Sequence, residues 1–189
     1  MNKPLVWVLG ILLLVGAFFV TTYNRLVSLN EGVDSQWAQV EGQYQRRFDL
    51  IPNLVESVKG VMRQEQDVFK AIADARTRYA GASSIDEKAQ AASQVEGAIG
   101  RLLVIMENYP QLRSVETVTN LMSQLEGTEN RISVERKRYN DLVRDFNVSI
   151  KKTPTNLIAA VLGFKERAYF EAAAGSEVAP KVNLQTIKQ

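Results

Sequence analysis

The sequence contains neither cysteine nor histidine. Without cysteine no disulfide framework can form, and the Cys/His sites that hold zinc are excluded. Without histidine a His₂Glu metal site has no ligands, and the Ser-His-Asp and Cys-His mechanisms lack their general base. Serine, lysine and carboxylates remain, but their spacing identifies no nucleophile, so a hydrolase built on them is the least favoured alternative. We therefore predict a protein that is not an enzyme and holds no cofactor or metal ion.

An excess of charge of one sign is also missing. Lys plus Arg number 23 and Asp plus Glu number 21, which gives a net charge of +2. Non-specific nucleic-acid binding depends on many phosphate contacts by basic side chains, so nucleic acid is a poor candidate partner. Nucleotide-binding glycine loops are absent as well, because Gly97 and Gly100 fall inside a helical pattern with no strand before them.

Residues 5–20 lack any charged residue, proline, asparagine or glutamine. Extended to Tyr23, this stretch reaches about 28 Å as a helix, close to the thickness of a bilayer's hydrocarbon core. A helix satisfies its own backbone groups and can therefore cross lipid as a single segment. Trp7 and Tyr23 lie near the two ends, where amphipathic rings favour the membrane interface. We predict a transmembrane anchor over residues 1–23.

A cleaved signal peptide is the main alternative to a retained anchor. Residues 17–22 read AFFVTT, which is a poor cleavage site because small residues are needed there. The positively charged Lys3 precedes the apolar stretch, and Arg25 is the single positively charged residue between that stretch and Arg46. The positive-inside rule then gives a weak preference for a cytoplasmic N-terminus and an extracytoplasmic domain.

Residues 24–152 show helical periodicity throughout and predict an antiparallel, up-down four-helix bundle. The first helix continues from the anchor without a break, and Pro52 is expected to end it. The second is predicted from Pro52 to Tyr79, the third over 85–106 behind a Ser84–Glu87 capping box, and the fourth over 114–152. The fold class is therefore all-α.

The segment 153–170 follows the fourth helix, whose end should lie near the lipid in an up-down bundle. It contains an apolar stretch, 156–164, that is too short to span a membrane and is followed by Lys165 and Arg167. It is predicted either as a helix lying in the membrane interface or as a cap on the open end of the bundle. Residues 171–189 have little periodicity and are predicted to form a loose tail.

Several polar residues interrupt the predicted apolar seams. Glu65, Arg76, Thr128 and Glu135 are predicted to fix helix register through cross-helix ion pairs, or to face a cavity or a partner. The 46–49 stretch, Arg-Arg-Phe-Asp, is placed at the membrane-distal corner, where it would pair with Glu107 or Glu116 or form a docking surface. The carboxylate pairs Glu126/Glu129 and Asp141/Asp145 could hold a hard cation, but a solvated helix face is the favoured interpretation.

Six motifs together resemble the LemA family of bacterial membrane proteins, over residues 23–170. They are Tyr23-Asn24-x-Leu26-Val27, the run 46–55 (RRFDLIPNLV) with Val58-Lys59, Tyr109-Pro110-x-Leu112, residues 125–132 (LEGTENRI), Arg138-Tyr139-Asn140, and Pro154-x-Asn156-Leu157-Ile158-Ala159 with Gly163-Phe164-Lys165. A departure is Gly60-Val61-Met62, which carries no aromatic residue after the glycine.

The resemblance implies a single N-terminal transmembrane helix, a long helical bundle, no known enzymatic activity, and location in the bacterial inner membrane. It also implies a scaffold or adaptor role at the cell envelope, and a membrane-bound heat-shock metalloprotease as a partner. We expect self-association and partner binding to use Arg46, Arg47, Asp49, Asn53, Glu126, Glu129 and Asn130. The predicted membrane-interface residues are Trp7, Tyr23, Lys151, Lys152, Phe164, Lys165 and Arg167.

The alternative function is binding of anionic lipid. Lys151, Lys152, Lys165 and Arg167 would then hold the headgroups and organise the membrane around the protein.

Overall fold

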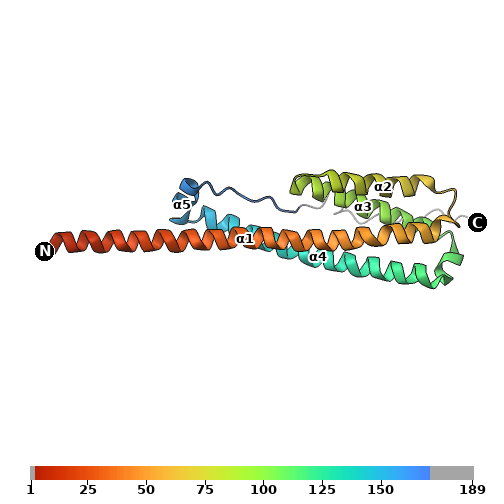
Figure 1. The fold of residues 1–189 in the computed structure, drawn as a ribbon, viewed down its shortest axis with the longest axis horizontal. Helices are drawn as coiled ribbons and strands as arrows, with labels where there is room; N and C mark the ends of the chain where they lie inside the picture. The colour runs from red at the N-terminus through yellow and green to blue at the C-terminus, as the bar shows by residue number, and fades with distance from the viewer. Residues whose placement is uncertain (1–2, 171–189) are drawn as a thin grey trace, which may run out of the picture. The chain divides into compact units, whose positions relative to one another are not determined.

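The computed structural model describes residues 3–170, which are helical and contain no strand (Figure 1). The α-helices are α1 (Lys3–Lys59), α2 (Gln66–Gly81), α3 (Ile85–Met106), α4 (Glu116–Lys151) and α5 (Thr155–Leu162), with a 3₁₀ turn at Pro110–Ser114. The predicted all-α class is confirmed. The predicted loose tail, 171–189, lies outside the described residues.

The helices form two compact units. In one, α1 and α4 pack along each other and α5 contacts both; in the other, α2 packs against α3. Each unit is an antiparallel helix pair, as expected for successive helices joined by short links.

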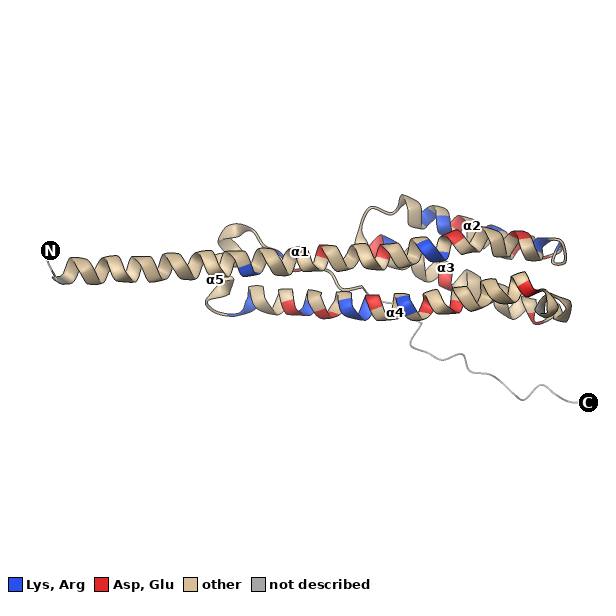
Figure 2. Cartoon of the chain, turned by 60° about the horizontal axis from the view of Figure 1, so that its bottom comes forward, with Lys and Arg blue, Asp and Glu red and all other residues tan. Residues whose placement is uncertain are grey.

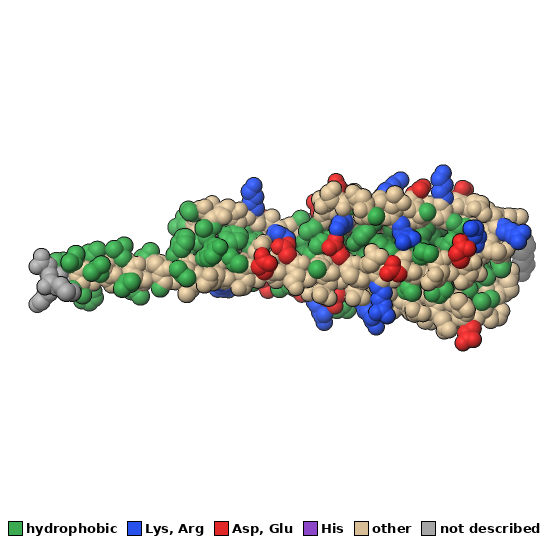
Figure 3. All heavy atoms as spheres, in the orientation of Figure 1, with side chains coloured by type: hydrophobic (Ala, Val, Ile, Leu, Met, Phe, Trp, Pro, Cys, Tyr) green, Lys and Arg blue, Asp and Glu red, His purple; other side chains and the backbone are tan. Residues whose placement is uncertain are grey.

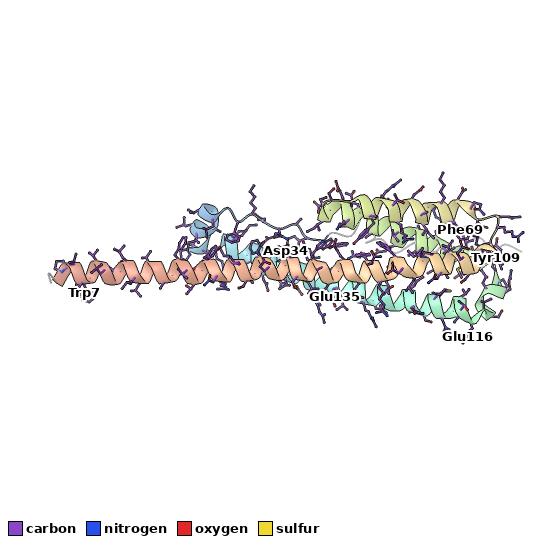
Figure 4. The ribbon with its side chains drawn as sticks, in the orientation of Figure 1. Trp7, Asp34, Phe69, Tyr109, Glu116 and Glu135 are labelled. Atoms are coloured by element: carbon purple, nitrogen blue, oxygen red, sulfur yellow. The ribbon has the colours of Figure 1, made fainter. Side chains whose placement is uncertain are left out.

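Helix α1 changes character along its length. Every residue from Pro4 to Thr21 is exposed, including Trp7, whose ring points away from the helix in Figure 4. Burial begins at Thr22 and then recurs at Leu26, Val33, Val40 and Tyr44, at steps of four and seven residues, which is the spacing of one helix face. Among the described residues, α1 alone is long and apolar enough to cross a membrane.

The prediction that Pro52 ends the first helix is wrong, because α1 runs through Pro52 to Lys59. An interior proline removes one backbone hydrogen bond and clashes with the preceding turn, which costs about 3 kcal/mol. Beyond Pro52, however, Leu54 and Val58 are buried, as is Ile51 just before it. Burial of each such side chain contributes about 1.5–3 kcal/mol, so packing outweighs the proline.

The second helix is consequently shorter than predicted. The seam expected over residues 52–79 belongs partly to α1, and α2 begins only at Gln66. The chain leaves α1 in a turn where Val61 and Met62 both donate backbone hydrogen bonds to the Val58 carbonyl at 3.0 Å. In contrast, α3 and α4 lie within two residues of their predicted limits, and the Ser84–Glu87 capping box is present.

Contacts between α1 and α4 define a register. Arg47 pairs with Glu129, and the Trp37 ring packs edge-on against Tyr139 with centroids 5.3 Å apart. Ten residues separate the members of these pairs on either helix, so the helices run antiparallel without slippage. Continued toward the anchor, the same register brings Thr22 level with Pro154, just beyond the end of α4.

Candidate interaction surface and membrane-proximal cap

The antiparallel register brings the two groups of predicted interaction residues to the same level. Arg46, Arg47 and Asp49 lie on α1, and Glu126 to Asn130 lie opposite them on α4. The predicted position of this motif at the bundle corner is wrong, since α1 continues for about three turns beyond Asp49. The two motifs are therefore in contact through Arg47 and Glu129, and this contact could not be predicted from either motif alone.

Arg47 is the buried centre of this region. Its side chain is 6% exposed, whereas that of its ion-pair partner, Glu129, is 44% exposed. The prediction that Glu107 or Glu116 would be the ion-pair partner is therefore wrong. Figure 4 places Glu116 at the start of α4. The Arg47 Nε atom has no hydrogen-bond partner among the described residues, so Glu129 carries most of the compensation for this buried charge.

The remaining predicted interaction residues are exposed. Arg46, Asn53, Glu126 and Asn130 present their side chains to solvent, and Asp49 accepts a hydrogen bond from Gln45 at 2.8 Å on its own helix. The Arg47–Glu129 pair thus joins the two helices in a region where these polar side chains remain exposed.

The predicted seam residues form different contacts from those expected. Glu135 accepts a hydrogen bond from Gln36 across the α1–α4 seam at 2.6 Å, and it pairs with Arg138 on its own helix at 2.8 Å (Figure 4). Thr128 donates to the Leu125 carbonyl within α4. Glu65 accepts from the Tyr109 hydroxyl at 3.2 Å in the α2–α3 unit, and partial burial, then this hydrogen bond, raises the pKa of Tyr109.

A segment after α5, residues 164–168, lies back along the hairpin; we call it the strap. Asn147 holds it with two hydrogen bonds: its side-chain amide donates to the Arg167 carbonyl at 2.9 Å, and its oxygen accepts from the Arg167 N–H at 2.8 Å. The Tyr139 hydroxyl donates to the Ala168 carbonyl at 2.9 Å. Sequence reasoning missed this clamp, although a polar Asn147 between the seam residues Val143 and Ile150 was the available signal.

The strap also settles where several predicted membrane-interface residues lie. The Phe164 ring packs against Phe146, and Arg167 pairs with Asp34 while also hydrogen-bonding Asn30. Lys151 pairs with Glu166 at 2.8 Å. Within residues 3–170, Lys152 and Lys165 are left exposed and without an ion pair.

Charged residues are distributed unevenly along the α1–α4 hairpin and α5. Figure 2 shows neither blue nor red ribbon over residues 4–24 of α1 or on α5, and both colours interspersed along the rest of α1 and along α4. Asp141 and Asp145, considered as a cation site, both bind Arg144, and the hydrogen bond to Asp145 and the charge of Asp141 raise the pKa of Arg144. Among the described residues, no three acidic side chains cluster in a way that could hold a metal ion.

The α2–α3 unit carries a shallow hollow of about 410 Å³ on its own surface. Small residues and a few polar ones line it, and they include Ala71, Asp74, Ala75, Gly97, Ala98 and Arg101. The lining has one carboxylate, two arginines and one amide, and it offers no paired acid and base.

These features define a membrane-associated helical protein with one candidate span among the described residues. The chain belongs to the LemA family, whose sequence model matches residues 36–184. The expectation drawn from its motifs is thereby confirmed.

Curated relatives agree with this assignment. The chain is 29% identical to magnetosome protein MamQ of Magnetospirillum gryphiswaldense, over 91% of this chain and 75% of the relative. It is 28% identical to magnetosome protein MamQ 2 of Paramagnetospirillum magneticum, over 83% and 68%. It is 22% identical to protein LemA of Metamycoplasma hominis, over 88% and 78%. None of these names denotes an enzymatic activity.

Proposed function

We propose that this LemA-family protein is a single-pass membrane-anchored scaffold that binds partner proteins at the bacterial envelope and performs no catalysis. The observation that carries the proposal is the continuity of α1. One helix of 57 residues contains both the exposed apolar segment and the buried seam that packs against α4. A partner bound on the α1–α4 hairpin is thereby fixed relative to the bilayer without an intervening linker.

The polar residues around Arg47 supply the candidate binding face. Arg46 and Asn53 on α1 and Glu126 and Asn130 on α4 are exposed near the ion pair of the buried Arg47 with the half-exposed Glu129, which holds the helices in register. Exposed arginine, asparagine and carboxylate groups on rigid helices can form specific hydrogen bonds with a partner at little entropic cost. A second copy of the chain and a membrane-bound heat-shock metalloprotease, which the family resemblance suggests, are the partners to test first.

Photo-crosslinking in native membranes tests this proposal. A photoreactive amino acid would replace Asn53 or Asn130 in the full chain, with Gln124, which is exposed on a different face of α4, as the matched control. We expect the same discrete adducts from positions 53 and 130 and none of them from position 124. An adduct of twice the chain's mass identifies self-association. Recovery of monomer alone from all three positions would refute the scaffold role.

Anionic-lipid binding through four cations has less support as the main function. Lys151 and Arg167 are engaged by Glu166 and Asp34, which leaves Lys152 and Lys165 for headgroups. Two exposed lysines add electrostatic attraction to a membrane surface but provide little headgroup specificity.

A further inference from the structure

From Leu157 to Leu162 helix α5 is apolar on every side, yet protein covers only one side of it. Its sequence, TNLIAAVL, contains no charge. Ile158 and Ala159 are buried against the hairpin, whereas Leu157 is 66% exposed and Val161 80% exposed. The latter two are four residues apart and so lie on one helix face. A helix that is hydrophobic all round is normally surrounded by nonpolar groups. The face of α5 that carries Leu157 and Val161 has no such cover from the described residues.

The position of α5 indicates what covers the other half. It contacts both α1 and α4, and the hairpin register places its start level with Thr22. Thr22 is the first buried residue of α1, immediately after the segment long and apolar enough to cross a membrane. The outer face of α5 therefore lies at the level where α1 leaves the bilayer.

The surroundings of α5 match a membrane interface in composition. Figure 3 shows hydrophobic side chains gathered over α5 and along the N-terminal part of α1. Lys152 before the helix and Lys165 after it are exposed, and Tyr23, next to Thr22 on α1, is exposed as well. Cations and a tyrosine beside an apolar surface are the combination that favours the headgroup region.

We propose that the outer face of α5, formed by Leu157 and Val161, inserts into the interface of the bilayer that α1 crosses. The inner face caps the α1–α4 hairpin while the outer face contacts lipid. Because Asn147 and Tyr139 hold the strap that follows α5, the helix is fixed on the hairpin. This second membrane contact goes beyond the scaffold role, since it sets how the hairpin stands on the membrane whatever binds to it.

The absence of cysteine from the chain makes the test direct, because any introduced cysteine is unique. Spin labels would be placed one at a time by Leu157→Cys and Val161→Cys in the full chain, reconstituted in bilayers of phosphatidylethanolamine and phosphatidylglycerol. Leu13→Cys reports the span, and Val134→Cys, at a residue 48% exposed on α4, is the matched aqueous control. Accessibility to oxygen and to a water-soluble nickel chelate is measured at each site.

We expect labels at 157 and 161 to favour oxygen over the nickel chelate several-fold relative to position 134, and to approach position 13. Values at 157 and 161 equal to those at 134 would overturn the inference while leaving the span intact. Low accessibility to both reagents together with dipolar broadening would also overturn it, since a second copy would then cover this face. A label at 13 open to the nickel chelate would overturn membrane anchoring itself.

A charge substitution provides an independent measurement. Val161→Asp in the chain labelled at position 157 should move that label out of the interface and raise its nickel accessibility several-fold. Val134→Asp, which adds the same charge at another exposed valine, should not. An unchanged label at 157 in the Val161→Asp protein would contradict insertion.

Discussion

The α1–α4 hairpin and the α2–α3 hairpin are both antiparallel helix pairs, but different contacts hold them together. Polar cross-links fix the first pair, namely Arg47–Glu129, Gln36–Glu135 and the Asn147 clamp on the strap. In the second, small residues such as Ala92 and Ala98 are buried together with Ile72 and Ile99, and a cross-helix polar contact, Arg78 to Gln94 at 2.8 Å, is exposed. Directional contacts specify one register, whereas small apolar residues specify mainly close approach.

The largest expected loss of stability follows substitution of Tyr139 in the α1–α4 hairpin. Tyr139 is fully buried between Trp37 and the strap. Tyr139→Ala should lower the free energy of unfolding by about 3–5 kcal/mol, since it removes a large buried ring and leaves a cavity. Circular dichroism of the full chain during thermal unfolding in mild detergent measures this. Tyr139→Phe, which loses only the hydroxyl, should cost about 1 kcal/mol; equal losses for both would show that the ring contributes little.

The Arg47–Glu129 pair should respond asymmetrically to removal of either partner. Glu129→Ala leaves a buried guanidinium without compensation and should cost about 2–3 kcal/mol. Arg47→Met leaves a half-exposed carboxylate that water can solvate, so its cost should stay within about 1 kcal/mol. The same unfolding measurement decides, and a larger loss from Arg47→Met would mean that burial in this region is not as described.

The α2–α3 hairpin should be destabilised by overpacking of its interface. Ala92 is fully buried, and Ala92→Leu should cost about 1–3 kcal/mol because a close-packed interface has no room for the added carbons. Ala80→Leu, at an exposed position on α2, should change stability by less than about 0.5 kcal/mol. Amide hydrogen exchange of α2 and α3 separates this effect from the other hairpin, whose amides should be unaffected.

The smallest expected effect concerns the start of α3. Ser84→Ala should destabilise that helix by about 1 kcal/mol through loss of the cap. Backbone hydrogen bonds from Ser83 and Ser84 lower the pKa of Glu87. Its contribution to stability is therefore present above the ordinary carboxyl pKa and disappears as the pH falls through the lowered, folded-state pKa. Far-ultraviolet circular dichroism against pH should show this loss in the native chain and not in Glu87→Gln.

Local signals predicted much of the fold. The apolar segment, the limits of α3 and α4, and the capping box each depend on residues close together in sequence. Pro52 misled the prediction because its local cost is real, while the burial of Leu54 and Val58 that offsets it comes from packing that a one-dimensional pattern does not contain.

The candidate site was predictable as a set of residues but not as a set of contacts. The motifs at 46–53 and 126–130 were identified, but their pairing through Arg47 and Glu129 depends on register, which follows from where α1 ends. Arg167 illustrates the same limit: its charge beside apolar residues predicts a headgroup contact, and its ion pair with Asp34 on α1 could not be predicted from that pattern. Long-range ion pairs are chosen by geometry that periodicity does not encode.

In the proposed anchored arrangement, the unbroken passage of α1 from candidate span to hairpin would let the membrane set the position of the hairpin. From Tyr23 to Lys59 the helix extends about 54 Å. A tilt of roughly 20°, ordinary for a transmembrane helix, would swing its far end sideways by about 18 Å. Changes in bilayer thickness that alter tilt would be amplified at that end, so α1 acts as a lever whose fulcrum lies at the membrane surface.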